Sequence, residues 1–347
     1  MPYRRVVIRQ YGPPEVLEVV EEPDLPEPGA GQVRVKVLAA SASYTDTMIR
    51  KGAYPEVREK PPFALGYDMV GVVDKLGRGA GRFQVGDRVC DLTVIGAYSE
   101  YLCVDEDRLV SVPDAVDPGE AVSLVLSYMT AYQMIHRTAK VQPGRTIFVQ
   151  GASGAVGSAL LALAQLDGIR VYGTASAASH GRLSRFGATL IDYRREDFVE
   201  RLRAKVPGGV DAAFDALGLK SFKRSLKTVR RGGTLVAYGF THSVDRGKAA
   251  VVFDFLGFKL MALMPGARRK TFYSITAVRD RHPDWFAQDL TALFGLLAEK
   301  RIKPVIWKRL PLSAAREAHE LIERSEPKGK IILLPSGAGP TEAGPTP

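Results

Sequence analysis

The first 120 residues carry the pattern of short β-strands. Residues 32–38 alternate apolar and charged side chains, so Val33, Val35 and Val37 are expected to face a core. Further strands are expected at 6–9, 17–21, 67–76, 87–92, 98–104 and 109–112. Glycine-containing turns separate these segments, and many short strands of this kind predict a closed or barrel-like antiparallel unit.

From about residue 123 the pattern changes to strands that alternate with helices. A helical pattern over 120–138 precedes an apolar strand at 146–150. Later strands are expected at 170–174, 189–192, 210–215, 234–238 and 270–275, and helices at 179–186, 196–205 and 220–229. This alternation predicts a doubly wound parallel sheet, so the fold class is α/β.

The end of the chain returns to mixed elements. Apolar residues at helical spacing predict an amphipathic helix over 284–300, and Ser313 is expected to cap a last helix over 314–324. A strand over 329–334 ends the fold, and the glycine- and proline-rich residues 336–347 are expected to be disordered. The unusually apolar segment 251–265 fits either an adaptable wall for a bulky substrate or a helix in a core or dimer interface.

The most informative motif is a glycine turn between strand 146–150 and an Ala/Leu-rich helix. The turn contains Gly151, Ala152, Ser153, Gly154, Ala155, Val156 and Gly157. Gly154 would let the backbone approach a pyrophosphate, Gly157 would allow close packing of the helix, and the helix N-terminus favours an anion. These residues predict a dinucleotide site, although Ala152 replaces the usual first glycine; a turn without ligand is the alternative.

Composition narrows the classes of function. The 347 residues are 46% hydrophobic, enough for two cores, and no apolar run is long enough to cross a bilayer. The beginning of the chain lacks the apolar stretch of a signal peptide, so the cytoplasm is expected. Cys90 and Cys103 are expected to be buried thiols. The net charge of +10 is spread along the chain, which favours anionic small ligands and gives no clustered stretch for nucleic acid.

Several motifs together resemble the medium-chain dehydrogenase/reductase superfamily, and most closely its zinc-free quinone oxidoreductase branch, which includes the zeta-crystallin and vesicle-amine-transport types. They are Pro-Gly-x-Gly-Gln-Val-x-Val at 28–35, Tyr-Thr-Asp-Thr-Met-Ile-Arg at 44–50, Gly-Ala-Tyr-Pro at 52–55, Leu-Gly-Tyr-Asp-Met-Val-Gly at 65–71, Val-Gly-Asp-Arg-Val at 85–89 and Ile-Asp-Tyr-Arg at 191–194. The resemblance implies a GroES-like β-barrel catalytic domain over 1–122, completed by 280–335. It also implies a Rossmann NADP(H)-binding domain over 123–279, an active cleft between the two domains, and a homodimer.

The resemblance also locates the metal ligands of zinc-dependent relatives, which are a cysteine, a histidine and a second cysteine. Ser43, Tyr67 and Leu126 stand at the matching positions. None of these side chains supplies the thiolate, imidazole or carboxylate that zinc requires. We therefore expect no metal.

The predicted cofactor is NADPH, with NADH less favoured. The region 171–182 lacks the acidic residue that holds the ribose hydroxyls of NAD, and Thr174, Ser176, His180 and Arg182 are the candidate partners there. By resemblance, Tyr193 lies near the 2′-phosphate; the alternative is an aromatic residue that covers the end of a strand.

The resemblance places further residues around the cofactor. Thr130 would lie beside the nicotinamide, and the backbone of Gly239 and Phe240 would pass on the same side, although a glycine there suits any turn. Lys330 would reach the pyrophosphate; the alternative is an exposed lysine at the beginning of a strand.

Without a metal, a hydride must go to a carbon that is already electrophilic, as in a quinone or an α,β-unsaturated carbonyl. By resemblance, Tyr54 is the candidate hydrogen-bond donor, or else a loop aromatic, and water could supply the proton instead. Ser43 could also donate to the substrate oxygen. Tyr67 would fill the emptied metal pocket or belong to the core, and Asp46 (a helix cap) and Asp68 are expected to be structural.

The sequence thus predicts an NADPH-dependent, metal-free reductase of apolar quinones or enones, without a membrane span and with no sign of nucleic-acid binding. An enoyl-thioester reductase is the alternative enzyme. A cofactor-binding protein with a non-catalytic role is the alternative of a different class.

Overall fold

The computed structural model describes residues 1–244, 246–325 and 328–335. Contacts divide the chain into two compact units. Unit 1 consists of residues 1–126 and the described part of 287–347, and unit 2 of residues 127–286. The tail 336–347, expected to be disordered, lies outside the described residues.

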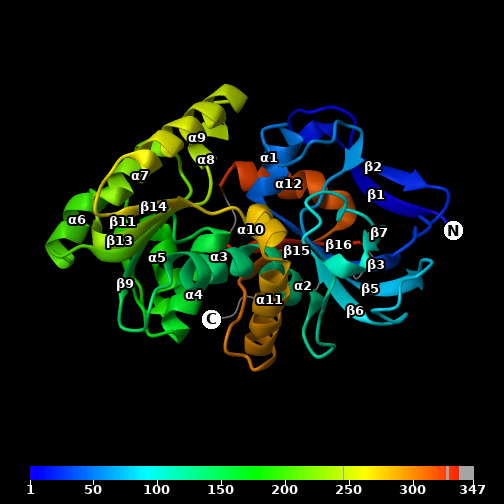
Figure 1. The fold of residues 1–347 in the computed structure, drawn as a ribbon. Helices are drawn as coiled ribbons and strands as arrows, with labels where there is room; N and C mark the ends of the chain where they lie inside the picture. Colours follow the sequence, from blue (N-terminus) through cyan, green and yellow to red (C-terminus); the bar gives the residue numbers. More distant parts are fainter. Residues whose placement is uncertain (245, 326–327, 336–347) are drawn as a thin grey trace. The chain divides into compact units, whose positions relative to one another are not determined.

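Unit 1 is built on two sheets (Figure 1). The smaller has the order β2-β1-β4, from β1 (Tyr3–Ile8), β2 (Leu17–Glu22) and β4 (Phe63–Ala64). The larger has the order β15-β16-β3-β5-β6-β8, from β15 (Ile306–Pro311), β16 (Lys330–Leu334), β3 (Gln32–Ala42), β5 (Met69–Leu76), β6 (Arg88–Asp91) and β8 (Val110–Ser111), with β7 (Tyr101–Asp105) beside β3. An isolated bridge between Arg5 and Ser99 links the two.

The alternating pattern of β3 is confirmed, because Val33, Val35 and Val37 are fully buried. Most strands pair antiparallel, whereas β15, which the sequence did not reveal, runs parallel to β16. The helices of this unit are α1 (Tyr44–Arg50), α2 (Pro118–Ser123) and α12 (Ala315–Glu323), and α11 (Pro283–Ala298) continues into it from unit 2. Short 3-10 turns lie at Pro14–Val16, Glu106–Arg108 and Leu312–Ala314.

The predicted cap of the last helix is wrong. Ser313 lies inside the 3-10 turn, and the N-cap of α12 is Ala314, whose side chain makes no capping hydrogen bond. The extra turn arises because the chain leaves β15 through Pro311, which is extended, and tightens before the helix begins.

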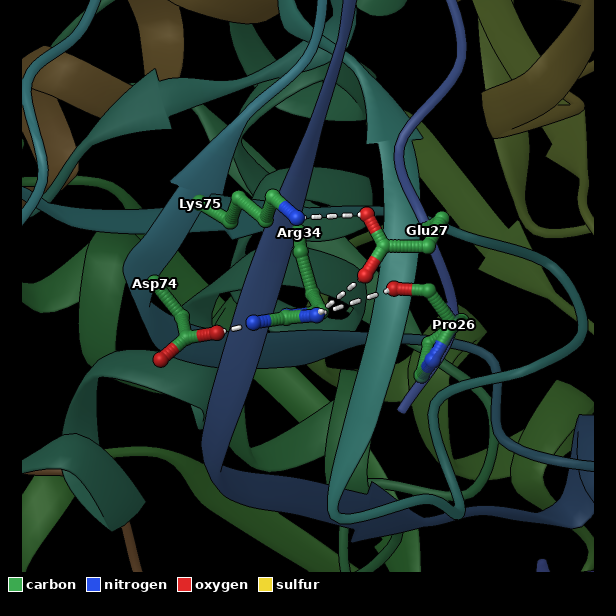
Figure 2. A network of polar contacts seen from close by, with 5 residues as sticks. All are labelled: Pro26, Glu27, Arg34, Asp74 and Lys75. Atoms are coloured by element: carbon green, nitrogen blue, oxygen red, sulfur yellow. Dashed lines mark hydrogen bonds and ion pairs between the residues drawn. The ribbon is translucent and has the colours of Figure 1, made fainter. Parts of the chain in front are cut away.

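A polar network fastens the proline-rich loop before β3 to the larger sheet (Figure 2). The guanidinium of Arg34 donates to Asp74 Oδ2 at 2.5 Å and to the carbonyl oxygen of Pro26 at 3.3 Å. Lys75 Nζ donates to Glu27 at 2.6 Å, and Glu27 also accepts from Arg34 at 3.5 Å. Arg34 is only 9% exposed, so this network fixes the loop to a buried side chain of the sheet.

Unit 2 contains the predicted parallel sheet, with the order β11-β10-β9-β12-β13-β14. Its strands are β9 (Thr146–Val149), β10 (Arg170–Ala175), β11 (Thr189–Asp192), β12 (Val210–Asp215), β13 (Val229–Ala237) and β14 (Arg269–Phe272). The order reverses between β9 and β12, which is the switch point at which doubly wound sheets bind ligands.

Helices cover both faces of this sheet (Figure 1), with α3, α4 and α5 on one face and α7 and α9 on the other. The helices are α3 (Met129–Gln133), α4 (Ala155–Leu166), α5 (Ala177–Leu183), α6 (Phe198–Lys205), α7 (Leu219–Leu226), α8 (Thr241–Val244), α9 (Lys248–Leu263) and α10 (Ile275–Arg281), with a 3-10 turn at Ser184–Phe186. The helical pattern predicted over 120–138 is a nearly continuous run in which π-helical turns at Leu124–Tyr128 and Met134–Ala139 flank α3.

The apolar segment 251–265 forms most of α9. Val251, Phe258 and Met261 are buried against the rest of unit 2. The opposite face exposes apolar side chains along its length: Val252, Phe253, Leu256, Leu260 and Leu263, followed by Met264. The core of unit 2 therefore buries only one face of α9, and the other apolar face is exposed.

Candidate cofactor and substrate sites

The turn after β9 is held in place by the neighbouring strand. Gly151 has a φ of +76°, a left-handed conformation that favours glycine. Its N–H donates to Thr174 Oγ1 at 2.9 Å, and the N–H of Ala152 donates to the carbonyl oxygen of Thr174 at 2.8 Å. Thr174, a predicted cofactor residue at the end of β10, therefore positions the turn, and its hydroxyl already accepts a backbone N–H.

Two glycines of the turn differ in what the packing requires. A Cβ on Gly157 would lie 2.2 Å from the carbonyl oxygen of Gly151, so only glycine lets α4 begin this close to the turn. A Cβ on Gly154 would lie 3.5 Å from the same oxygen, an ordinary contact. Packing alone does not demand glycine at 154, and its role in approaching a pyrophosphate stays a prediction.

The N-terminus of α4 is suited to an anion. Gly154 is the N-cap and has no side chain with which to accept the N–H groups of the first turn. The helix is 12 residues long, and its dipole adds partial positive charge at this end. Ser153, Ala155 and Val156 lie at the same place, so the residues present fit a dinucleotide pyrophosphate.

Arg182 reaches back from α5 to this turn. Its Nη2 atom donates to the carbonyl oxygen of Ser153 at 3.5 Å. Its Nη1 atom is buried, and within the described ranges it has no hydrogen-bond partner. Burial lowers the pKa of Arg182, which shows that the cation is held partly out of water. An unsatisfied buried donor of this kind fits a phosphate oxygen.

The other residues predicted at the end of β10 lie at the beginning of α5, the helix that also carries Arg182. Ser176 is the N-cap of α5, and its Oγ atom lies 3.4 Å from the Oγ atom of Ser179. His180 Nε2 lies 3.2 Å from the carbonyl oxygen of Ala175. Both side chains therefore have local contacts at the same strand end.

Sequence reasoning missed two cations at the end of β11. Ala175 pairs with Asp192 across β10 and β11, so the chain leaves both strands side by side. Tyr193 is 52% exposed there, with the Arg194 guanidinium 5.8 Å from its ring centre. Arg194 and Arg195 follow directly, and their position after the predicted strand 189–192 was the signal that could have identified them.

The residues predicted beside the nicotinamide are all packed within unit 2, each in a different way. Thr130 is buried on α3, which packs against α4. The ring of Phe240 stacks on Phe272 with centres 5.2 Å apart, so only its backbone is free to face a ligand. A Cβ on Gly239 would lie 3.2 Å from Ala216 Cβ, which makes glycine favourable there for packing as well.

In unit 1, Tyr54 and Tyr67 form a pair. Their hydroxyl oxygens lie 2.6 Å apart, and their rings meet edge to face with centres 5.7 Å apart. The Tyr54 hydroxyl also donates to Glu56 Oε2 at 2.7 Å. Tyr67 is fully buried and Tyr54 half-buried. Glu56, two residues beyond Tyr54, was likewise not recognised from the sequence.

Burial keeps both phenols protonated. It raises the pKa of Tyr54 well above 10, and the negative charges that Tyr67 and Glu56 can carry act in the same direction. Burial also raises the pKa of Tyr67. Both side chains are therefore neutral O–H groups over the physiological pH range, able to donate to a substrate oxygen.

Ser43 is engaged at the beginning of α1. It is the N-cap of this helix, and its hydroxyl donates to Asp46 Oδ2 at 2.5 Å while its N–H donates to the same oxygen at 2.9 Å. Asp46 is therefore the third residue of a capping box and not the cap itself. The hydroxyl proton of Ser43 is thus directed to Asp46, as that of Tyr54 is directed to Glu56.

Buried charges surround this helix start. Burial raises the pKa of Asp46 to about 7, against the opposing effect of the hydrogen bonds from Ser43. Lys330 Nζ donates to Ser41 Oγ at 2.7 Å, and that hydroxyl donates to Asp68 Oδ1 at 2.6 Å. Lys330 is thus a buried residue and not an exposed one, and burial lowers its pKa. Its predicted contact with a pyrophosphate stays a prediction.

The residues at the metal-ligand positions do not fit zinc. The Ser43 oxygen bears a proton that is donated to Asp46, and the Tyr67 phenol is held neutral. Leu126 offers no donor atom. Across the part of the chain that the structure describes, no group of three or more histidine, cysteine, aspartate or glutamate residues could hold a metal ion.

Comparison with known proteins identifies the family. A model described as "Alcohol dehydrogenase GroES-like domain" matches residues 29–114, and one described as "Zinc-binding dehydrogenase" matches residues 186–333. A 2-haloacrylate reductase from Burkholderia is 30% identical over 95% of this chain and 98% of its own length. The chain belongs to the medium-chain dehydrogenase/reductase superfamily, in its quinone oxidoreductase branch.

Other members of the family agree with this placement. The quinone oxidoreductase of Rattus norvegicus is 28% identical over 95% of this chain and 97% of its own. The crystal structure of the Escherichia coli quinone oxidoreductase complexed with NADPH superposes with a TM-score of 0.85, at 28% identity, over 96% of this chain and all of that one. The GroES-like and Rossmann-type folds are thereby confirmed, and the protein is an oxidoreductase by family. No helix in the described ranges is long and apolar enough to span a bilayer.

Proposed function

We propose that this oxidoreductase uses NADPH, without a metal ion, to reduce a quinone or an α,β-unsaturated carbonyl. The observation that supports the proposal is the Tyr54–Tyr67 pair, whose two hydroxyl groups lie 2.6 Å apart and whose member Tyr67 matches, by resemblance, a metal-ligand position of zinc-dependent relatives. The names of the relatives, quinone oxidoreductase and 2-haloacrylate reductase, describe acceptors in which a multiple bond is activated by conjugation.

Unit 2 would hold the cofactor. The turn from Gly151 to Gly157 and the N-terminus of α4 would bind the pyrophosphate through backbone N–H groups. The buried Nη1 atom of Arg182 and the cations Arg194 and Arg195, with Ser176, His180 and Tyr193 beside them, would bind the 2′-phosphate. When bound, the reduced nicotinamide supplies the hydride, and Thr130 with the backbone of Gly239 and Phe240 would orient its ring.

Unit 1 would act on the acceptor. As the substrate oxygen gains negative charge, the Tyr54 hydroxyl donates a hydrogen bond and then its proton, while Tyr67 donates to the Tyr54 oxygen. Conjugation in the acceptor spreads the charge, so no Lewis acid is required. Ser43 would support this arrangement by beginning α1 beside the pair.

The test is oxidation of NADPH and of NADH across quinones, enones and trans-2-enoyl thioesters, with a chelator present throughout. The proposal expects turnover with NADPH and with quinones or enones, unchanged by the chelator. Turnover with enoyl thioesters but not quinones would favour the enoyl-thioester reductase. Binding of NADPH without turnover of any acceptor would favour a non-catalytic role, and loss of activity on removal of zinc would refute the metal-free mechanism.

We also propose that the protein is a homodimer, with the exposed face of α9 in the interface. The helix α9 contacts β14, the last strand in the order of its sheet, so a second copy that covers the exposed face of the helix could also reach this edge. The variant F253E/L260E should then shift the mass measured by light scattering from dimer to monomer. A mass that is the same for the wild type and this variant would refute the proposed interface.

A further inference from the structure

Three side chains of unit 1 form a continuous line of hydrogen bonds from solvent to the core. Glu56 is exposed, Tyr54 is half-buried and Tyr67 is fully buried. The Glu56 carboxylate lies 2.7 Å from the Tyr54 hydroxyl, which lies 2.6 Å from the Tyr67 hydroxyl. Tyr54, the accessible phenol, is therefore bonded on one side to a buried hydroxyl and on the other to a group that exchanges protons with water.

The direction of these hydrogen bonds follows from the chemistry of the groups. An ionised carboxylate only accepts, so the single proton of the Tyr54 hydroxyl is directed to Glu56. The Tyr54 oxygen must then accept from Tyr67, whose own proton is directed outward. Both phenolic protons therefore point along the line toward Glu56.

This arrangement determines what happens when Tyr54 gives up its proton. A tyrosinate beside a carboxylate places two negative charges at hydrogen-bond distance, and such a pair strongly favours the uptake of one shared proton. The exposed carboxylate is the member of the pair that solvent can reach. Replacement of the proton would thus pass through Glu56.

We propose that Glu56 returns the proton to Tyr54 in each turnover and that Tyr67 is a positioning residue for this exchange. The proposal rests on the proposed function, which supplies the hydride. The hydride adds to the acceptor carbon, and the resulting oxyanion forms an O–H bond as the O–H bond of Tyr54 breaks. The Glu56 carboxylate then takes a proton from solvent and passes it to the Tyr54 oxygen, which leaves Glu56 ionised again, so one proton is consumed for each hydride.

The variant E56Q tests the proposal, because glutamine keeps the shape and a hydrogen bond but cannot carry the proton. The first-turnover rate of NADPH oxidation should stay within about twofold, while kcat falls about tenfold and its solvent isotope effect rises. A small carboxylic acid such as formic acid should restore part of the lost kcat. The control is E59Q, which removes the same charge from the same loop, where Glu59 accepts from the N–H of Arg58, and should leave kcat unchanged. An unchanged kcat and isotope effect in E56Q would overturn the proposal.

A titration without substrate separates this proposal from the proposed function. The tyrosinate absorbance of Tyr54 can be isolated as the difference between the protein and its Y54F variant during alkaline titration. Removing the Glu56 charge should lower the pKa of Tyr54 by about one unit in the E56Q background. Should no acceptor be reduced by the wild type, the proposed function fails, whereas an unshifted titration refutes the contact on which the proton path depends.

Discussion

The candidate site of unit 2 is formed mainly by backbone groups, whereas that of unit 1 is formed by side chains. In unit 2 the glycine turn offers backbone N–H groups and one unsatisfied arginine nitrogen, and the neighbouring strand holds the turn in shape through Thr174. In unit 1 the candidate site consists of side chains that bond to one another, as in Ser43 with Asp46 and Tyr54 with Tyr67, while one buried oxygen each of Asp46 and Asp68 has no hydrogen-bond partner among the described residues.

This difference has an energetic consequence. The backbone N–H groups at a helix N-terminus are present with every residue except proline, so unit 2 can offer them to a ligand without burying ionisable side chains. Unit 1 keeps ionisable side chains inside the protein, where desolvation opposes charge. We therefore expect substitutions in unit 1 to reveal strain and loss of turnover, and substitutions in unit 2 to reveal loss of cofactor binding.

The largest expected effect concerns the buried charge of unit 1. The pKa of Asp46 rises from 3.8 when exposed to about 7 when folded, so the folded state binds more protons between these values and stability falls as pH rises through them. The variant D46N removes this penalty. Its free energy of unfolding should exceed that of the wild type by on the order of 4 kcal/mol above about pH 8, and the gain should vanish below about pH 4.

Urea unfolding at several pH values measures this difference. D114N, a change of the same kind at a residue whose side chain is 91% exposed, should show no comparable dependence on pH. A gain for D46N that is constant across the pH range would mean that Asp46 is not strained by desolvation.

The next largest effect is expected for G157A, which tests whether the glycine turn of unit 2 binds the pyrophosphate. G157A places a Cβ 2.2 Å from the Gly151 carbonyl oxygen, so it should lower stability by about 3 kcal/mol and weaken NADPH binding strongly. G181A, on the exposed side of α5 with nothing within 4 Å of the added Cβ, should leave NADPH binding unchanged and raise stability by about 0.5–1 kcal/mol. Thermal unfolding and fluorescence titration with NADPH provide the two measurements; normal binding by G157A would contradict the proposed position of the pyrophosphate.

Removing the Tyr54 hydroxyl tests whether unit 1 supplies the proton while unit 2 binds the cofactor. Y54F should lower kcat/KM about a hundredfold, because the proton donor is lost, while the Kd for NADPH stays unchanged. Y11F, which removes a hydroxyl that donates to the Glu59 carbonyl oxygen at 3.2 Å, serves as the control and should retain activity. Stopped-flow kinetics with a quinone acceptor decide the matter, and full activity in Y54F would leave water as the proton source.

The smallest expected effect concerns the choice of cofactor. R182Q should raise the Kd for NADPH about tenfold and leave that for NADH unchanged, because only NADPH carries the 2′-phosphate. R185Q removes an exposed cation whose guanidinium lies 4.7 Å from the ring centre of Phe186, and should change neither value. Equal weakening of both cofactors in R182Q would show that Arg182 stabilises the turn through Ser153 and does not select the phosphate.

The parts of the fold that depend on local pattern were predictable. The strands at 189–192 and 210–215 have the predicted bounds, and β3 buries its three valines as its alternation required. The strand β15 and the cap of α12 were not found, because β15 is defined by its partner β16, and the cap by the path of the chain after Pro311.

The residues of the candidate site also fall into those that the sequence predicted and those that it did not. The glycine turn was identified because its residues are consecutive and its function belongs to the backbone. Glu56 and the burial of Lys330 were not recognised, since each depends on what lies beside the residue in space, whereas Arg194 could have been identified from its position directly after the predicted strand 189–192. Ser43 was proposed as a donor, although its proton is directed to Asp46 by the geometry of a helix start that residue identity alone does not give.

The sequence by itself determined the two kinds of architecture, the family and the position of the dinucleotide turn, because hydrophobic period and glycine spacing act over a few neighbouring residues. Only the tertiary structure decided which polar groups are satisfied and which remain free. That outcome depends on desolvation and on hydrogen bonds between residues far apart in the chain, such as Ser41 with Lys330.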